Sequence, residues 1–291
     1  MTDVREQAIQ LYDRYTHEHL DRRRLLREMT ALAGSVAAAE ALILGIGASA
    51  AAAQVIPADD KRLFTARNTN EMAGKPLTTY SAWPRDVKAV RGSVLVIHEN
   101  RGLNAHIEDV TRRVGLAGFV AVAPDFLSAQ GGTPADPDKA RAMIGEADYD
   151  LLLAQAVGAL DFMAKVHGDR AKAGAVGFCW GGAFVNRLAV AAGPKLAAGV
   201  SYYGPAPDPA EAAKVQAALM IHLAGNDARV NATAEPWIAA LKAAGKEVER
   251  FTYPGVEHAF NNDTSAERYD KAAADLAWKR TTDFLGRELD A

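Results

Sequence analysis

Short, nearly continuous apolar runs alternate with longer amphipathic stretches along most of the chain. Runs of this kind, rich in Val, Ile, Leu and Ala, are typical of strands buried on both faces of a sheet. They lie at 92–99, 119–127, 171–178, 196–204, 217–227 and 247–255. Stretches with the apolar spacing of helices lie at 107–118, 151–166, 181–193, 234–245 and 272–289. This alternation predicts one α/β domain over residues 57–291, with a mostly parallel central sheet and helices on both faces.

The N-terminal segment, residues 1–56, differs in kind from the rest. A charged stretch leads into three arginines at 22–24, and a small and apolar run follows at 29–56. Basic residues before an apolar run that ends in small residues, here the alanines at 51–53, resemble a twin-arginine export signal. This predicts export to the periplasm. Because Glu40 places a charge within the run, two alternatives stay open: an Ala-rich helix packed on a cytoplasmic protein, or an uncleaved membrane anchor.

Composition excludes several partners. The 291 residues carry a formal net charge of only −3 and show no basic stripe with interleaved aromatics, so nucleic acid is not an expected partner. The single cysteine cannot form an intramolecular disulfide. His98-Glu99 lacks a second histidine four residues on, so the spacing indicates no helical zinc motif, and no metal is expected.

The chain's only cysteine, Cys179, lies where a predicted strand ends and a predicted helix begins. Gly177 and Gly181 flank it in the pattern G-x-C-x-G, the cysteine form of a nucleophile elbow. Glycines two residues either side remove the collisions that so sharp a turn would otherwise cause. The thiol would then lie at the carboxyl edge of the sheet and at a helix N-terminus, which favours a thiolate. A buried, inert cysteine beside a glycine turn is the alternative.

Two later residues stand in the chain order that such a nucleophile requires. Asp227 follows one predicted strand and His258 follows the next, so an acid and then a histidine come after the elbow. Asp227 could instead only cap a helix, and His258 could be an ordinary loop histidine. All three in the required order favour a Cys-His-Asp triad.

The sequence resembles the dienelactone hydrolase family, whose members are thiol enzymes of the α/β-hydrolase fold, over residues 91–285. The resemblance is carried by "IHENRGLN", "APDFL", "GAVGFCWGG", "SYYGPAP", "LAGNDARV" and "YPGVEHAFNN". It implies hydrolysis of a small lactone or carboxylic ester through a thioester on Cys179, without a cofactor. It also implies that Glu99 contacts the thiol and helps to deprotonate it. A salt bridge from Glu99 to Arg101 is the alternative.

Further roles follow from the proposed chemistry. The backbone N–H groups of Trp180 and Asn100 would hold the oxyanion. Where the family has an arginine that binds the substrate carboxylate, this chain has Asn262, and Arg141 is the nearest candidate for a second arginine. The remaining predicted substrate contacts are aromatic: Phe126, Tyr203 and Phe260.

Two other functions remain open. A thioesterase or a general carboxylesterase would use the same three residues. A non-catalytic member of the fold could use Cys179 as a thiol-based redox sensor or bind a ligand, although a sensor needs neither Asp227 nor His258.

Overall fold

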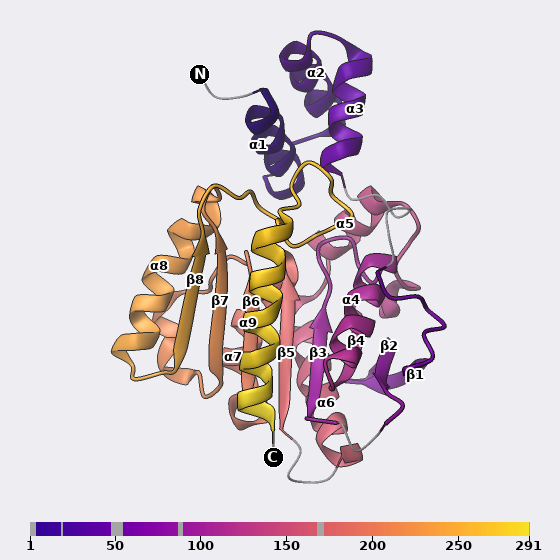
Figure 1. Ribbon diagram of the computed structural model, residues 1–291, viewed down its shortest axis with the longest axis vertical. Helices are drawn as coiled ribbons and strands as arrows, with labels where there is room; N and C mark the ends of the chain where they lie inside the picture. Colours follow the sequence, from indigo (N-terminus) through magenta and orange to yellow (C-terminus); the bar gives the residue numbers. More distant parts are fainter. Residues whose placement is uncertain (1–3, 19, 48–54, 87–89, 168–171, 291) are drawn as a thin grey trace.

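The computed structural model describes residues 4–18, 20–47, 55–86, 90–167 and 172–290. A single eight-stranded sheet runs through it in the order β1-β2-β4-β3-β5-β6-β7-β8 (Figure 1). The strands are β1 (Leu63–Met72), β2 (Lys75–Pro84), β3 (Ser93–Ile97), β4 (Val120–Asp125), β5 (Ala173–Phe178), β6 (Ala198–Tyr202), β7 (Ala218–Ala224) and β8 (Val248–Tyr253). The pairs from β4 to β8 are all parallel, which confirms the predicted mostly parallel sheet.

The antiparallel hairpin of β1 and β2 was not predicted. The two strands turn at Ala73 and Gly74, both with positive φ, and β2 continues the sheet by pairing antiparallel with β4. Strand β1 is mostly exposed at the sheet edge, so it shows neither a buried run nor a regular polar alternation. Its pairing with β2, rather than its pattern, makes it a strand.

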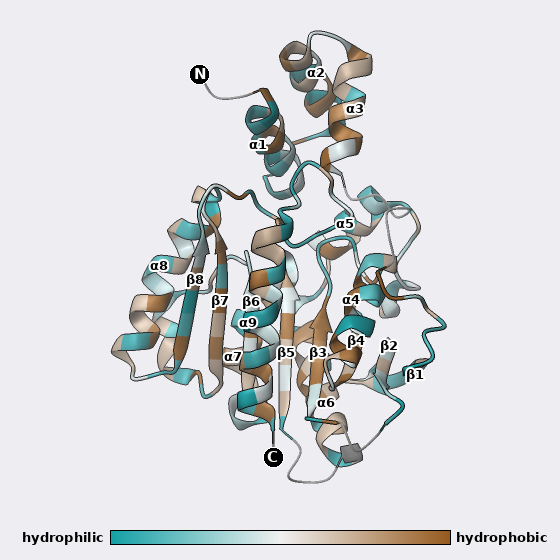
Figure 2. Cartoon of the chain, in the orientation of Figure 1, coloured by the Kyte–Doolittle hydropathy of each residue, from teal (hydrophilic) through white to brown (hydrophobic). Residues whose placement is uncertain are grey.

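Helices cover both faces of the sheet, as predicted (Figure 1). In β3, Val94 and Val96 belong to the core under α4 and α9, whereas Leu95 and Ile97 belong to the opposite core under α6, α7 and α8. Successive side chains of a strand point to opposite faces, so a strand between two layers must be apolar throughout. Figure 2 shows this as brown central strands. The helices are α4 (Ala105–Leu116), α5 (Pro137–Gly145), α6 (Tyr149–His167), α7 (Trp180–Ala191), α8 (Ala228–Ala243) and α9 (Lys271–Leu289).

Three N-terminal helices form a separate unit beyond one end of the sheet (Figure 1). They are α1 (Val4–His17), α2 (Arg22–Ala33) and α3 (Val36–Ile46). Their apolar side chains pack in a small core of their own, which includes Ile9, Leu25, Met29 and Ile46. The alanines at 51–53 lie outside the described residues. No single described helix is long and apolar enough to cross a membrane; α2 and α3 meet that test only as a pair bent by 111°.

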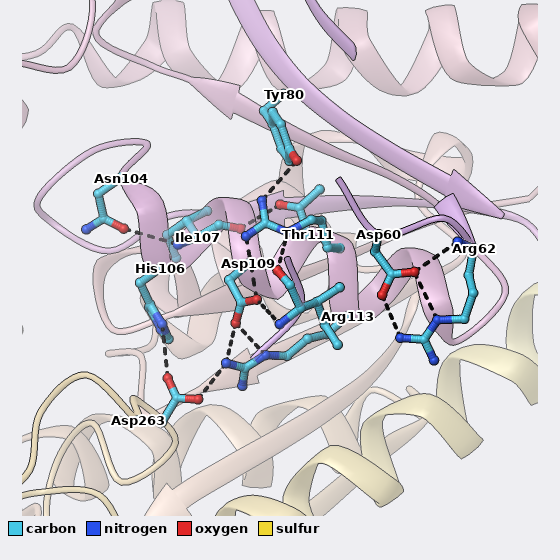
Figure 3. Close-up of polar contacts among 12 residues, drawn as sticks. Asp60, Arg62, Tyr80, Asn104, His106, Ile107, Asp109, Thr111, Arg113 and Asp263 are labelled. Atoms are coloured by element: carbon cyan, nitrogen blue, oxygen red, sulfur yellow. Dashed lines mark hydrogen bonds and ion pairs between the residues drawn. The ribbon is translucent and has the colours of Figure 1, made fainter. Parts of the chain in front are cut away.

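A buried polar network joins α4 to two other parts of the chain (Figure 3). The Asp109 carboxylate accepts hydrogen bonds from Arg113 Nε at 2.7 Å and from the backbone N–H of Ile56 at 2.7 Å. Arg113 also pairs with Asp263 at 2.5 Å, and His106 lies 3.4 Å from the same carboxylate. Asp263 belongs to the loop after β8. The network therefore fixes, against α4, the loop that also carries His258.

Candidate active site

The turn from β5 into α7 holds Cys179 in a strained conformation. Its backbone has φ 55° and ψ −112°, a region that costs a residue other than glycine about 1–3 kcal/mol. A Cβ at Gly177 would lie 2.1 Å from the carbonyl oxygen of Gly181, and one at Gly181 would lie 2.5 Å from that of His98. Both positions therefore require glycine. The thiol is nearly buried and lies at the N-terminus of α7.

His258 and Asp227 lie together at the same edge of the sheet. His258 Nδ1 donates to Asp227 Oδ2 at 2.5 Å, and the second carboxylate oxygen accepts from the N–H of Val230 at 3.1 Å. Asp227 thus caps α8 and orients the histidine at once. Burial favours the neutral form of this carboxyl, but the hydrogen bond and positive charge of His258 and the N–H of Val230 together outweigh burial and lower the pKa of Asp227.

The remaining ring nitrogen of His258 is directed toward the thiol. His258 is 2% exposed, and its Nε2 has no hydrogen-bond partner among the described residues. A ring nitrogen of His258 lies within 4.8 Å of Cys179 Sγ, and Nδ1 is already bound to Asp227. Burial tends to lower the pKa of His258, but the negative charge of a Cys179 thiolate and the bond to Asp227 raise it to about 10. His258 is therefore electrostatically suited to accept and hold a proton beside the sulfur.

The C-terminal end of α1 covers this group. His17 Nε2 lies 3.2 Å from Cys179 Sγ, and its ring meets that of His258 edge-on with centroids 4.9 Å apart. Burial and the neighbouring positive charge of His258 hold the pKa of His17 well below its usual value. His17 is thus a neutral partner for the thiol. The sequence does not indicate this contact between His17 and the thiol, because residues 1–56 resemble an export signal and such a signal is not part of the folded domain.

Further contacts hold α1 over the site. Asn100 Nδ2 donates to the carbonyl oxygen of Thr16 at 3.4 Å, and Arg141 Nη1 donates to that of Tyr15 at 3.0 Å. The guanidinium of Arg141 also lies 4.3 Å from the centroid of the Tyr15 ring. Arg268 reaches Asp13 at 3.3 Å, and Arg101 donates to the hydroxyl of Tyr12.

The side chain of Glu99 is hydrogen-bonded to Asn262, a partner that was not predicted. Its carboxylate accepts a hydrogen bond from Asn262 Nδ2 at 2.9 Å, and the guanidinium of Arg101 donates to the hydroxyl of Tyr12. Glu99 and Cys179 line the same small space of about 20 Å³, which has room for about one water molecule. Asn262 therefore orients Glu99 beside the thiol.

A cavity of about 490 Å³ opens beside Cys179. It is lined by His17, Asn100, Arg141 and Trp180, among others. Trp180 is the first residue of α7, so its backbone N–H has no partner within the helix and is available to an oxyanion. Arg141, a predicted substrate contact, does reach this cavity; its Nη1 donates to the carbonyl oxygen of Tyr15, whereas its buried Nε has no hydrogen-bond partner among the described residues.

The aromatic residues predicted to contact substrate lie in the core instead. Phe126 packs on Phe184 with ring centroids 4.8 Å apart, and Phe260 packs on Tyr253 at 4.9 Å. Tyr203 is fully buried behind His258, with ring centroids 5.0 Å apart. None of these three predicted residues lines either cavity beside Cys179. Their side chains point between the sheet and its helices. The distance of a residue from a motif along the sequence does not reveal the direction of its side chain.

Comparisons with known proteins agree with this architecture. The model of the dienelactone hydrolase family matches residues 77–289. A carboxymethylenebutenolidase-like protein of Escherichia coli K12 is 27% identical over 253 residues, covering 82% of this chain and 92% of that protein. A protein of the same description from Methylorubrum extorquens is 32% identical over 209 residues, covering 66% of this chain and 71% of that protein.

Solved structures agree too. A dienelactone hydrolase-like protein from Klebsiella pneumoniae aligns with TM-score 0.69 and 26% identity over 77% of this chain and 99% of its own. A dienelactone hydrolase-like phosphotriesterase from metagenomic libraries aligns with TM-score 0.68 at 22% identity, covering 79% of this chain and 100% of its own, and supports the fold alone. The family match begins at residue 77, so helices α1 to α3 lie outside it.

Proposed function

The chain belongs to the dienelactone hydrolase family, whose members hydrolyse esters or lactones, and from this premise we propose that it does so through Cys179, His258 and Asp227. The observation that carries the proposal is the position of His258 beside the thiol: Nδ1 is bound to Asp227, and the buried Nε2 has no hydrogen-bond partner in the described part of the chain. A histidine oriented by a carboxylate and next to a strained nucleophile has the geometry of a catalytic triad.

The reaction follows from these positions. His258 takes the proton of Cys179, and the thiolate attacks the carbonyl carbon of the substrate. The negative charge that develops on the carbonyl oxygen is stabilised by the backbone N–H groups of Trp180 and Asn100. The C–O bond breaks, His258 protonates the leaving alkoxide, and a thioester remains on Cys179. Water, deprotonated by His258, then hydrolyses the thioester and releases the acid.

Glu99 has a supporting role in this proposal. Its carboxylate lines the same small space as the thiol and is held there by Asn262, so it is placed to serve as a second base for the thiol proton. We propose a small neutral ester or lactone as substrate. Support comes from the size of the cavity, about 490 Å³, and from Asn262, whose uncharged amide binds Glu99.

The test is hydrolysis of a small activated ester by the wild-type chain and by Cys179→Ala. We expect the substitution to reduce turnover by at least a thousandfold while leaving the melting temperature nearly unchanged, because a thiol is a small part of the core. Mass spectrometry of the wild type quenched with substrate should detect a covalent acyl group on Cys179. Full activity in Cys179→Ala would overturn the proposal. Acyl-enzyme with a thioester substrate but not with lactones would instead favour a thioesterase.

A further inference from the structure

Three side chains from distant parts of the chain bring potential metal ligands together. His17 ends α1, Cys179 occupies the elbow after β5, and His258 lies in the loop after β8. One ring nitrogen of each histidine and the sulfur of Cys179 all lie within 4.8 Å of one another, and His17 Nε2 is 3.2 Å from that sulfur. Imidazole nitrogen and thiolate sulfur are the ligands that Zn²⁺ prefers in proteins.

The hydrogen bonds of the two imidazoles direct both Nε2 atoms to the sulfur. His258 Nδ1 donates to the Asp227 carboxylate at 2.5 Å, and His17 Nδ1 donates to the carbonyl oxygen of Asp13 at 2.8 Å. A carbonyl oxygen and a carboxylate can only accept, so each neutral ring carries its proton on Nδ1 and a lone pair on Nε2. The single thiol proton cannot satisfy two such acceptors, and the buried Nε2 of His258 has no partner among the described residues.

We propose that His17, Cys179 and His258 form a binding site for Zn²⁺. A tetrahedral zinc ion with ordinary Zn–N and Zn–S distances separates its ligand atoms by about 3.4–3.6 Å. The three atoms here would reach that spacing through small side-chain rotations. On binding, the proton held by the Cys179–His258 pair leaves to solvent, and bonds from zinc to the thiolate and to the imidazole of His258 form. Each histidine keeps the Nδ1 hydrogen bond that orients a metal ligand in known zinc sites.

The site has room for a fourth ligand and would affect the whole molecule. The cavity of about 490 Å³ is lined by both His17 and Cys179, so a water molecule can complete the coordination from that side. The ion would occupy the nucleophile and at the same time join α1 to the rest of the chain. Zinc binding and ester hydrolysis would therefore exclude each other, and the metal would act as a reversible block. Metal binding itself does not depend on the proposed hydrolysis.

The site can be tested by titrating the metal-free, reduced full chain with Co²⁺ alone. A thiolate ligand gives a charge-transfer band in the near ultraviolet, and tetrahedral coordination gives intense visible bands. We expect one equivalent to bind with both signals and Zn²⁺ to displace it. Cys179→Ala should lose the charge-transfer band, and His17→Ala should bind at least tenfold more weakly. Glu18→Gln is the matched control, since Glu18 is exposed and adjacent to His17 but belongs to no ligand set; it should bind as the wild type does.

Two results would overturn the site: a wild-type titration without the thiolate band, or equal Co²⁺ affinity in the wild type and His17→Ala. Circular dichroism of each variant shows whether it is folded, so a loss of binding through unfolding is recognised. The hydrolase assay separates this proposal from the proposed function. A chain that binds Co²⁺ through Cys179 but hydrolyses no ester refutes only the function, and an active chain that Zn²⁺ does not inhibit refutes only the site.

Discussion

Replacing Asp227 by Asn separates the two tasks of this residue. One carboxylate oxygen caps α8 through the N–H of Val230, and the other orients His258 at 2.5 Å. Asparagine is as good a helix cap as aspartate, so the cap survives. An amide cannot hold the proton on His258 Nδ1 as a carboxylate does, so the ring adopts the other tautomer and Nε2 can no longer accept the thiol proton.

The expected magnitudes differ greatly for stability and for activity. Loss of a hydrogen bond between charged groups costs about 1.5–3 kcal/mol of unfolding free energy. Loss of the correct tautomer should lower kcat by about 10³–10⁴, which corresponds to about 4–5.5 kcal/mol in the activation barrier. Asp227→Asn is therefore expected to be a folded protein that is almost inactive.

The assay measures kcat and KM on a small activated ester, together with denaturant unfolding. Asp270→Asn is the matched control, because the Asp270 side chain caps α9 through the N–H of Ala273 at 2.8 Å, while its backbone N–H, which the substitution keeps, donates to the carbonyl oxygen of Phe260 at 3.0 Å. The control should keep its activity. If Asp227→Asn retained a tenth or more of wild-type kcat, or if both variants lost activity equally, the assignment of Asp227 to the triad would be refuted.

Three other predictions concern pH, the elbow and the N-terminal unit. Because the pKa of His258 is raised from 6.5 to about 10, its contribution to stability is complete below about pH 6.5 and is lost as the pH rises toward 10. The difference in melting temperature between the wild type and His258→Asn should therefore shrink over that range. A constant difference would contradict the charge assignment. Gly177→Ala places a Cβ 2.1 Å from the carbonyl oxygen of Gly181, so we expect loss of activity and a loss of about 1–3 kcal/mol of unfolding free energy. An unchanged melting temperature would refute the steric argument. Since α1 covers the site, we expect the active enzyme to retain residues 4–47. A chain lacking these residues should hydrolyse bulky esters relatively faster than small ones. N-terminal sequencing of the protein isolated from its host tests this, and a start near Gln54 would favour the export hypothesis instead.

Much of the fold could be predicted because its signals are local. Strands such as β3 and β5 are buried on both faces, so they must be continuously apolar, and the helices between them must each show one apolar face. The edge strand β1 gave no such signal, since most of its side chains are exposed. The partner of Glu99 could not be predicted either, because Asn262 reaches it from a loop far along the chain.

The amino-acid sequence alone determined the parallel α/β core, the glycines that the Cys179 turn requires, and the order of Cys179, Asp227 and His258 along the chain. Each of these depends on neighbouring residues or on chain order, which the sequence displays directly. Only the tertiary structure decided that His17 contacts the thiol, and that Phe126 and Phe260 lie in the core rather than in the cavity. Such contacts depend on the direction of side chains and on the packing of distant segments, and no local pattern encodes them.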